Sequence, residues 1–240
     1  MAARTESRRE RVRQQTLAEI RATARRLLIE RGQQAVTINA VAREMGMTGP
    51  ALYHYFAGLE ELVGAMTADF LRELADTMRA TRDAHATAAP ARRLLAICRA
   101  MREWALAHRA EFGMVFASPL PPSNRPGTSS ARFLAGQNFE QVFVDEIAEI
   151  WQATPFPVPD DLAPALRDQV AAYAAEAGWR LPPEVVHVMM SCWIRLYGLL
   201  CMEVLHQLDF IYTDLEPVYE ECLRDLAERL ALPYEPPAVG

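Results

Sequence analysis

A seven-residue stretch, Thr48 to His54, combines small side chains with two polar rings. Its first four residues, up to Ala51, carry little bulk, and Tyr53 and His54 add a hydroxyl and an imidazole. If a helix begins here, its backbone can approach a nucleic-acid groove closely. Hydroxyl and imidazole groups form hydrogen bonds to phosphate oxygens and to base edges. The stretch therefore indicates noncovalent recognition of a nucleic acid.

Two threonines are placed to support the same chemistry. Thr37 and Thr48 are typical N-cap residues, and each precedes a run of residues that can form a helix. A helix N-terminus carries partial positive charge and unpaired N–H groups, so both N-termini could face phosphates. Arg43, on the first of these two helices, is a further candidate for a phosphate contact. The alternative for Arg43 is a charge that simply faces solvent.

Motifs for covalent chemistry and metal binding are missing from the sequence. It contains no GxSxG elbow, no GxxxxGK[ST] loop and no HExxH pair, so we expect no catalytic residues and no enzyme activity. The four cysteines form no CxxC pair, which argues against a zinc site and a disulfide framework. His187 and His206 lack metal-ligand spacing to other candidate ligands. We therefore expect no metal and no cofactor.

Three short helices are expected to position the stretch. Apolar residues at helical spacing predict a first helix from Arg13 to Arg31, which Gly32 ends. A second helix follows Thr37, and Gly46 can adopt the left-handed conformation that ends it. A tight turn leads to the third helix, where Pro50 occupies the first turn and needs no intrahelical N–H. Two helices joined by such a turn form a helix-turn-helix.

Charge is distributed unevenly along the chain. Residues 1–56 contain ten arginines and five acidic residues, a formal charge of +5, whereas residues 57–240 contain fifteen arginines and twenty-six acidic residues, a charge of −11. Only the N-terminal part is therefore expected to bind a polyanion. Some of its arginines would form an arm that tracks a groove or its phosphates, with a solvated, disordered tail as the alternative. They are Arg4, Arg8, Arg9, Arg11 and Arg13.

The remainder of the chain is expected to be a larger helical domain, which gives an all-α protein. We place the boundary so that residues 1–57 form the helix-turn-helix domain and residues 58–240 the second domain. A long amphipathic helix after Phe56 is expected to touch both domains. Five helices of the second domain are predicted with both ends: Leu59–Ala84, Ala131–Trp151, Asp161–Ala177, Val185–Leu208 and Leu215–Leu230. A further helix is expected to begin at Pro90, followed by a short aromatic segment over Phe112–Phe116. Loops are predicted over 118–130 and 154–160.

The segment Val185 to Leu208 is apolar on nearly every side. Its length is close to that of a membrane span, but Arg195, Glu203 and two histidines favour the core of a soluble protein. A helix that is apolar all round must be covered all round, here by its own domain and a second subunit. We therefore expect a homodimer through the last two helices, no membrane span and, without an N-terminal signal peptide, a cytoplasmic protein. If buried, Arg195 and Glu203 each need a partner, across the dimer or in a pocket.

The segment Thr37 to Phe56 resembles the DNA-binding domain of the TetR/AcrR family of transcriptional regulators, within a match from Leu17 to Leu62. It has the family's threonine start, its Ala-x-x-x-Gly turn at Ala42 to Gly46 and its Leu-Tyr-x-x-Phe ending. The resemblance implies a ligand-binding and dimerisation domain behind the helix-turn-helix, and binding of double-stranded operator DNA. By resemblance, Tyr53 is a phosphate contact and His54 a neighbouring groove contact. Together with the residues singled out for their capping, small size or charge, they form the predicted DNA-binding set: Thr37, Arg43, Thr48, Gly49, Pro50, Tyr53 and His54. For Tyr53, packing in the small core is the alternative.

Two further positions bear on this resemblance. The family usually has a lysine just after the recognition helix, where Leu59 stands here, which puts that phosphate contact in question. In the C-terminal part, Cys192 to Glu203 is similar to the Trp-x-x-x-His-Gly segment of one TetR subfamily, with Tyr197 in the histidine position. The second similarity does not identify a ligand.

Eight apolar side chains are candidates for lining a ligand cavity between the helices of the second domain. For each of them, ordinary core packing is the alternative. They are Phe70, Met101, Trp104, Phe116, Phe139, Phe143, Trp193 and Tyr197. The leading hypothesis is a repressor that a small apolar ligand releases from its operator. There are two alternatives. One is an activator, and the other is an all-α ligand-binding protein whose helix-turn-helix no longer binds DNA.

Overall fold

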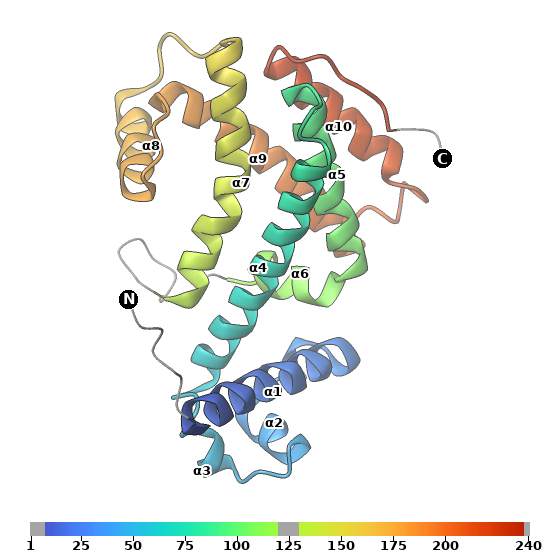
Figure 1. Cartoon of the computed structure of the whole chain (residues 1–240). Coiled ribbons are helices and arrows are strands. Elements are labelled where there is room, and N and C mark those ends of the chain that lie inside the picture. The colour runs from blue at the N-terminus through green and yellow to red at the C-terminus, as the bar shows by residue number, and fades with distance from the viewer. Residues whose placement is uncertain (1–7, 120–129, 238–240) are drawn as a thin grey trace. The chain divides into compact units, whose positions relative to one another are not determined.

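The computed structural model describes residues 8–119 and 130–237. Regular structure in these residues consists of ten α-helices and one 3-10 helix, with no strand among them (Figure 1). The prediction of an all-α protein is confirmed. Arg4 and most of the expected loop over 118–130 lie outside the described residues.

The chain divides into two compact units. Unit 1 comprises residues 1–70 and 110–133, and unit 2 comprises residues 71–109 and 134–240. This division differs from the expected boundary after residue 57. Unit 1 also includes the first part of α4 (Leu59–Ala84) and all but the first residue of α6 (Arg109–Phe116).

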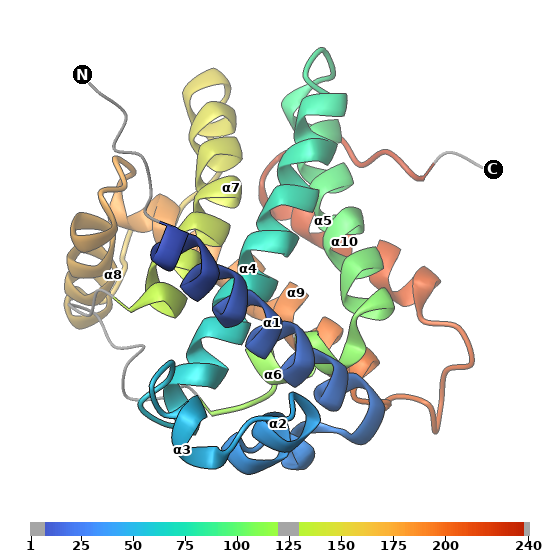
Figure 2. The ribbon, with the colours of Figure 1, turned by 60° about the horizontal axis from the view of Figure 1, so that its bottom comes forward.

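The helix-turn-helix of unit 1 lies against α1 (Arg8–Arg31). After the 3-10 helix (Gln33–Ala35) come α2 (Ile38–Glu44) and α3 (Gly49–Leu52), which lie on the same side of α1 in two views (Figures 1 and 2). Their shared core is fully buried. It consists of Ile20, Ala24, Leu27, Leu28, Val41 and Leu52. Burial of these apolar side chains supplies the stability that such short helices lack on their own.

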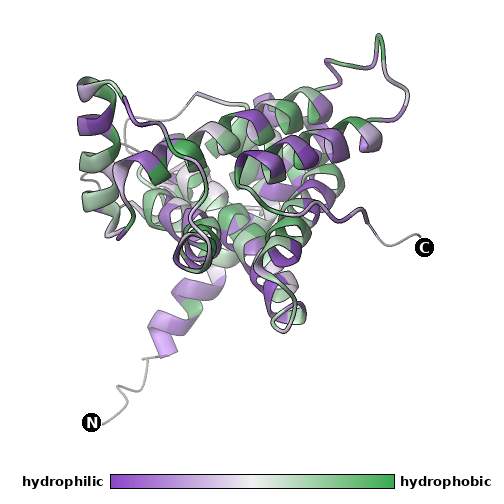
Figure 3. Cartoon of the chain, turned by 90° about the horizontal axis from the view of Figure 1, so that it is seen from above, coloured by the Kyte–Doolittle hydropathy of each residue, from purple (hydrophilic) through white to green (hydrophobic). Residues whose placement is uncertain are grey.

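The arginine-rich start of the chain is helical, which corrects the expected arm. Helix α1 begins five residues earlier than predicted, so the last four of the five candidate arginines lie within it and are exposed. The reason is local: arginine, glutamate and glutamine are good helix formers, and the Gln14 side chain donates to the Glu10 carboxylate at 2.8 Å one turn away. The first turns of α1 are mostly hydrophilic, beside the N label in Figure 3.

An ion pair joins α6 to α1 within unit 1. Glu111 is 2% exposed, and its carboxylate accepts a hydrogen bond from Arg25 Nε at 2.9 Å. The Arg25 guanidinium also lies 5.1 Å from the centre of the Phe70 ring on α4. A buried carboxylate needs such a partner. The sequence predicted only a short aromatic segment here, because nothing local pairs Glu111 with Arg25.

Unit 2 is arranged around α9 (Pro183–Val204), which packs against α5 (Pro90–Ala107), α8 (Pro164–Ala177) and α10 (Glu216–Arg229) (Figure 1). The other long helix is α7 (Ala131–Ala153). Helix α9 ends four residues earlier than predicted. The physical reason is a left-handed His206, at φ 58°, which lets the Gln207 N–H bond the Met202 carbonyl at 2.8 Å and closes the helix.

Helix α9 is not covered on every side within one chain. Val185 and Leu200 are fully buried, whereas Ile194 is 65% exposed. Arg195 is exposed, and the buried Glu203 pairs inside unit 2 with Arg102, not across a dimer. Among the described helices, α9 alone is long and apolar enough to cross a membrane by length and composition. Its exposed apolar side chains are Ile194 and Met202, followed by Leu205 just beyond its end.

Candidate nucleic-acid interface and apolar cavity

Two N-caps and a glycine set the turn between α2 and α3. The Thr37 hydroxyl accepts a hydrogen bond from the Ala40 N–H at 3.1 Å, and the Thr48 hydroxyl accepts one from the Ala51 N–H at 3.4 Å. Gly46 has a φ of +66°, in the left-handed region where an L side chain costs about 1 kcal/mol or more. Both caps and the turn glycine stand where the sequence predicted them.

Helix α3 is fixed against its neighbours from two directions. A Cβ added to Gly49 would lie 2.9 Å from the Asn39 side-chain oxygen on α2, so glycine permits this close approach. On the other side, Leu52 and Phe56 are buried in the core of unit 1. The remaining side chains of α3 and the turn after it therefore point outward.

The predicted DNA-contacting residues are distributed over α2, α3 and the residues that flank them. Six of the seven are exposed, and Gly49 is half-buried against α2. Tyr53 is 54% exposed, so it is not a core residue. Neither the Tyr53 hydroxyl nor the Arg43 guanidinium forms a hydrogen bond or an ion pair with any residue that the structure describes. Both groups are therefore available to an outside partner.

A second cation approaches the end of α3 from α1. The Arg13 guanidinium donates to the His54 carbonyl oxygen at 3.4 Å and lies 5.5 Å from the centre of the Tyr55 ring. By contrast, Arg26 and Arg31 are both within ion-pair distance of the Glu44 carboxylate, at 3.5 and 3.2 Å. Arg13, at the end of α3, and Arg43, on α2, are thus exposed positive charges of the helix-turn-helix region, while Arg26 and Arg31 pair within unit 1.

Leu59, just after the helix-turn-helix, occupies the position where the TetR/AcrR family usually has lysine. Leu59 is 40% exposed in the first turn of α4, where its leucine side chain can offer no hydrogen bond.

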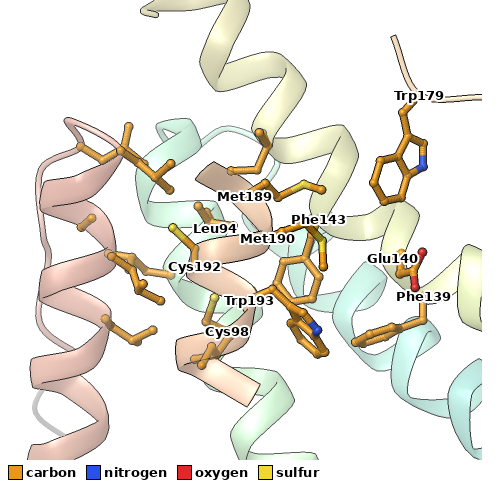
Figure 4. A pocket seen from close by; sticks show the side chains of 18 of the residues that line it. Leu94, Cys98, Phe139, Glu140, Phe143, Trp179, Met189, Met190, Cys192 and Trp193 are labelled. Atoms are coloured by element: carbon orange, nitrogen blue, oxygen red, sulfur yellow. The ribbon is translucent and has the colours of Figure 1, made fainter. Parts of the chain in front are cut away.

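A cavity of about 130 Å³ lies inside unit 2, between α5, α7, α8, α9 and α10 (Figure 4). Three rings form one wall: Trp193 lies 5.6 Å from Phe139 and 5.9 Å from Phe143 between ring centres. Aliphatic and sulfur-containing side chains form the rest of the apolar lining. They include Leu94, Leu95, Cys98, Ile147, Met189, Met190, Cys192, Leu196, Leu223 and Leu226. Burial raises the pKa of Cys98 to about 12, so this thiol stays protonated.

One polar pair interrupts the apolar lining. The Tyr173 hydroxyl on α8 donates to the Glu140 carboxylate on α7 at 2.6 Å, and the Trp179 ring packs edge-on against Tyr173 at 5.3 Å. Burial raises the pKa of Glu140, and the hydrogen bond from Tyr173 partly opposes that rise. Burial, together with the neighbouring carboxylate, also raises the pKa of Tyr173. Glu140 lies at the Trp179 side of the cavity in Figure 4.

The structure brings three of the eight predicted ligand-contacting residues together at the cavity: Phe139, Phe143 and Trp193. Tyr197 does not line the cavity, although its ring lies 5.5 Å from that of Trp193. Met101 and Trp104 belong to the buried core of unit 2, and Phe70 and Phe116 belong to unit 1. These four are not at this cavity. Glu140 and Tyr173 were missed by the sequence prediction, since residues 33 apart on two helices leave no local pattern.

Comparison with protein families agrees with both halves of this architecture. Residues 20–66 match the family model described as bacterial regulatory proteins, tetR family, and residues 94–226 match the tetracyclin repressor-like C-terminal domain. The chain belongs to the TetR family. It is therefore a DNA-binding transcriptional regulator and not an enzyme.

Individual relatives extend the similarity along most of the chain. The HTH-type transcriptional regulator Rv1816 of Mycobacterium tuberculosis is 28% identical over 196 residues, which is 81% of this chain and 83% of the relative. The crystal structure of SCO4313 matches with a TM-score of 0.69 and 29% identity, covering 92% of this chain and all of that one. RolR, solved with its ligand resorcinol, matches with a TM-score of 0.57 at 15% identity over 95% of this chain and 98% of its own, a likeness of fold.

Proposed function

We propose that this TetR-family regulator represses transcription as a homodimer on a palindromic operator and is released when a small, largely apolar ligand enters the cavity of unit 2. The observation that carries the proposal is the exposed surface of the helix-turn-helix, where Tyr53 at the end of α3 and Arg43 on α2 lack partners among the described residues. A recognition helix contacts base edges with residues near its N-terminus, and the first turn of α3 carries only the small or compact residues Gly49, Pro50 and Ala51.

Each predicted contact has a physical role in this proposal. The N-termini of α2 and α3, capped by Thr37 and Thr48, face phosphates. Gly49 and Pro50 leave the first turn of α3 without bulk, so its backbone approaches the base edges. Tyr53 and His54 then bond the DNA from the end of α3, and Arg43 adds a charge-assisted contact to a phosphate.

Ligand release requires that the ligand prefers one of two conformations. A dimer reads two half-sites on one face of DNA only if its recognition helices are about 34 to 36 Å apart. A ligand that binds better to a conformation with another spacing weakens DNA binding by the ratio of its two affinities. The cavity between five helices of unit 2 is the candidate place for that ligand. RolR, which shares this fold, was solved with a small aromatic ligand.

The second subunit is proposed to cover the exposed apolar side chains of α9. Ile194, Met202 and Leu205 would otherwise stay in water at a cost of about 25 cal/mol for each Å² of apolar surface. Dimerisation through α9 and α10 buries them and supplies the two copies of α3 that a palindrome needs. The same proposal puts the protein in the cytoplasm with its DNA.

Selection of genomic DNA fragments by the purified full-length protein tests the proposed function. We expect enrichment of a palindromic sequence and a steep loss of affinity with added salt, because the contacts to phosphate release counterions. Recovery of random fragments, with no motif, would favour the alternative of a ligand-binding protein whose helix-turn-helix no longer reads DNA. Enrichment upstream of genes whose transcription rises with the protein would indicate an activator.

Replacing Ile194 by aspartate is expected to convert the dimer to a monomer. The carboxylate would have to be buried in the proposed interface without a counter-charge. Sedimentation velocity measures the change, and affinity for the selected palindrome should fall with it. The matched control is Leu166→Asp on α8, a leucine that is 37% exposed outside α9 and α10. A dimer that survives I194D would show that the interface lies elsewhere.

A further inference from the structure

The cavity of unit 2 has an acidic group but no basic one. Among the described residues that line it, Glu140 alone carries an ionisable charge near neutral pH, and no arginine or histidine is part of the lining. The rest of the lining is aromatic, aliphatic or sulfur-containing. A ligand in this cavity therefore meets one carboxylate in an otherwise apolar wall.

Glu140 differs from the other carboxylates that lie inside unit 2. Glu146 pairs with Arg93 at 2.7 Å, and Glu203 pairs with Arg102 at 2.7 Å. No described cation pairs with Glu140, although desolvation raises its pKa. A desolvated carboxylate without a counter-charge is unfavourable for stability. Its place at a cavity wall suits a charge that a ligand neutralises.

The geometry leaves one carboxylate oxygen for that ligand. Oε2 of Glu140 accepts the hydrogen bond from the Tyr173 hydroxyl at 2.6 Å, which fixes the orientation of the carboxylate. Oε1 accepts no hydrogen bond from any described residue. In Figure 4 the carboxylate lies on the Trp179 side of the cluster formed by Phe139, Phe143 and Trp193.

We propose that the cavity binds a hydrophobic organic cation, specifically an arylalkylamine whose ammonium group donates to Oε1 of Glu140 and whose ring packs among Phe139, Phe143 and Trp193. This proposal rests on the proposed function, because it takes the cavity as the ligand site. The size is of the right order for the ring: an engineered cavity of about 150 Å³ binds benzene, and this cavity measures about 130 Å³, with Glu140 in its wall to receive the ammonium end of the chain.

Competing ligand classes fit the lining less well. A carboxylate or phosphate ligand would place its negative charge beside Glu140 with no cation in the lining. A hydrocarbon offers no donor to Oε1 and gains nothing from the carboxylate. An ammonium group has three N–H donors and is attracted to the faces of aromatic rings, which this wall supplies. The cation therefore satisfies both the carboxylate and the rings.

Calorimetric titration of the full-length protein with four probes that share one phenyl ring tests the proposal. The probes are 2-phenylethylamine, 2-phenylethanol, ethylbenzene and phenylacetate. We expect the amine to bind about tenfold to a hundredfold more tightly than the alcohol, the range for a hydrogen bond to a charged group. Phenylacetate should bind least. Glu140→Gln should reduce the affinity for the amine by a similar factor and leave that for ethylbenzene unchanged, which also shows that the variant keeps its cavity.

A matched control removes a nearby charge that is not part of the lining. Glu176→Gln changes an exposed carboxylate on α8 near Tyr173 and should leave the affinity for the amine within about twofold. Equal affinities for the amine and the alcohol, or an unchanged affinity of E140Q for the amine, would overturn the cation proposal. Binding of ethylbenzene in the same experiment would still support the cavity as a ligand site. Failure of all four probes to bind would overturn both the cation proposal and the proposed ligand site.

Discussion

Replacing Tyr53 by alanine is expected to weaken binding of the dimer to the selected palindrome by about a hundredfold to ten-thousandfold. The tyrosine is exposed, its hydroxyl is unpaired among the described residues, and each dimer would lose two contacts to phosphate. A contact to a charged group is worth about 1.5 to 3 kcal/mol, and about 1.4 kcal/mol changes an affinity tenfold. The measurement is a titration of labelled DNA at fixed salt, with the fold followed by circular dichroism.

Two further variants separate the causes of the Tyr53 effect. Tyr53→Phe keeps the ring and removes the hydroxyl, so a loss close to that of Y53A assigns the effect to the hydrogen bond. Ile29→Ala alters an exposed apolar side chain on α1 of the same unit and should leave DNA binding unchanged. If Y53A binds as tightly as the parent protein, Tyr53 makes no contact that matters for affinity.

Replacing Arg102 by alanine is expected to lower the free energy of unfolding by about 3 to 5 kcal/mol. The side chain of Arg102 bonds both oxygens of the Glu203 carboxylate, at 2.7 to 3.2 Å, and lies 5.2 Å from the centre of the Tyr219 ring. Its loss leaves Glu203 buried at the end of α9 without the cation that balances it. Urea unfolding monitored by tryptophan fluorescence measures the change.

Helix α5 offers a matched control for Arg102. Arg92 pairs with Glu235 at 3.1 Å, but both side chains are well exposed, so Arg92→Ala should cost less than about 1 kcal/mol. The double variant R102A/E203A should be less destabilised than the sum of its single variants, because neither charge is then left alone. Equal effects of R102A and R92A would show that burial does not strengthen the Arg102 pair.

The helix-turn-helix was readable from sequence because its signals are local. A threonine before each helix, a glycine at the turn and apolar residues three or four apart act within one or two helical turns. For the same reason the predicted bounds of the long helix, Leu59 to Ala84, coincide with those of α4. The predicted positions of Thr37, Thr48 and Gly46 follow from local geometry as well.

Other features depended on contacts between distant parts of the chain. Arg25 and Glu111 are 86 residues apart, and their pair places α6 in unit 1, where the sequence showed only aromatic residues. Arg102 and Glu203 are 101 residues apart, so the partner of Glu203 was left open between a dimer and a pocket. For Glu203 the sequence revealed a charge in an apolar segment but not the residue that balances it, and for Glu111 it gave no indication of the pair.

The helix-turn-helix and its outward residues were thus determined by the sequence alone, since the turn chemistry and the helical period leave few other arrangements for Thr48 to His54. Tertiary structure decided which aromatic residues meet. Phe139, Phe143 and Trp193 face one cavity, whereas Phe70 and Phe116 pack in the other unit. The physical reason is that helical periodicity specifies which face of a helix is apolar, but only the packing of several helices specifies what that face touches.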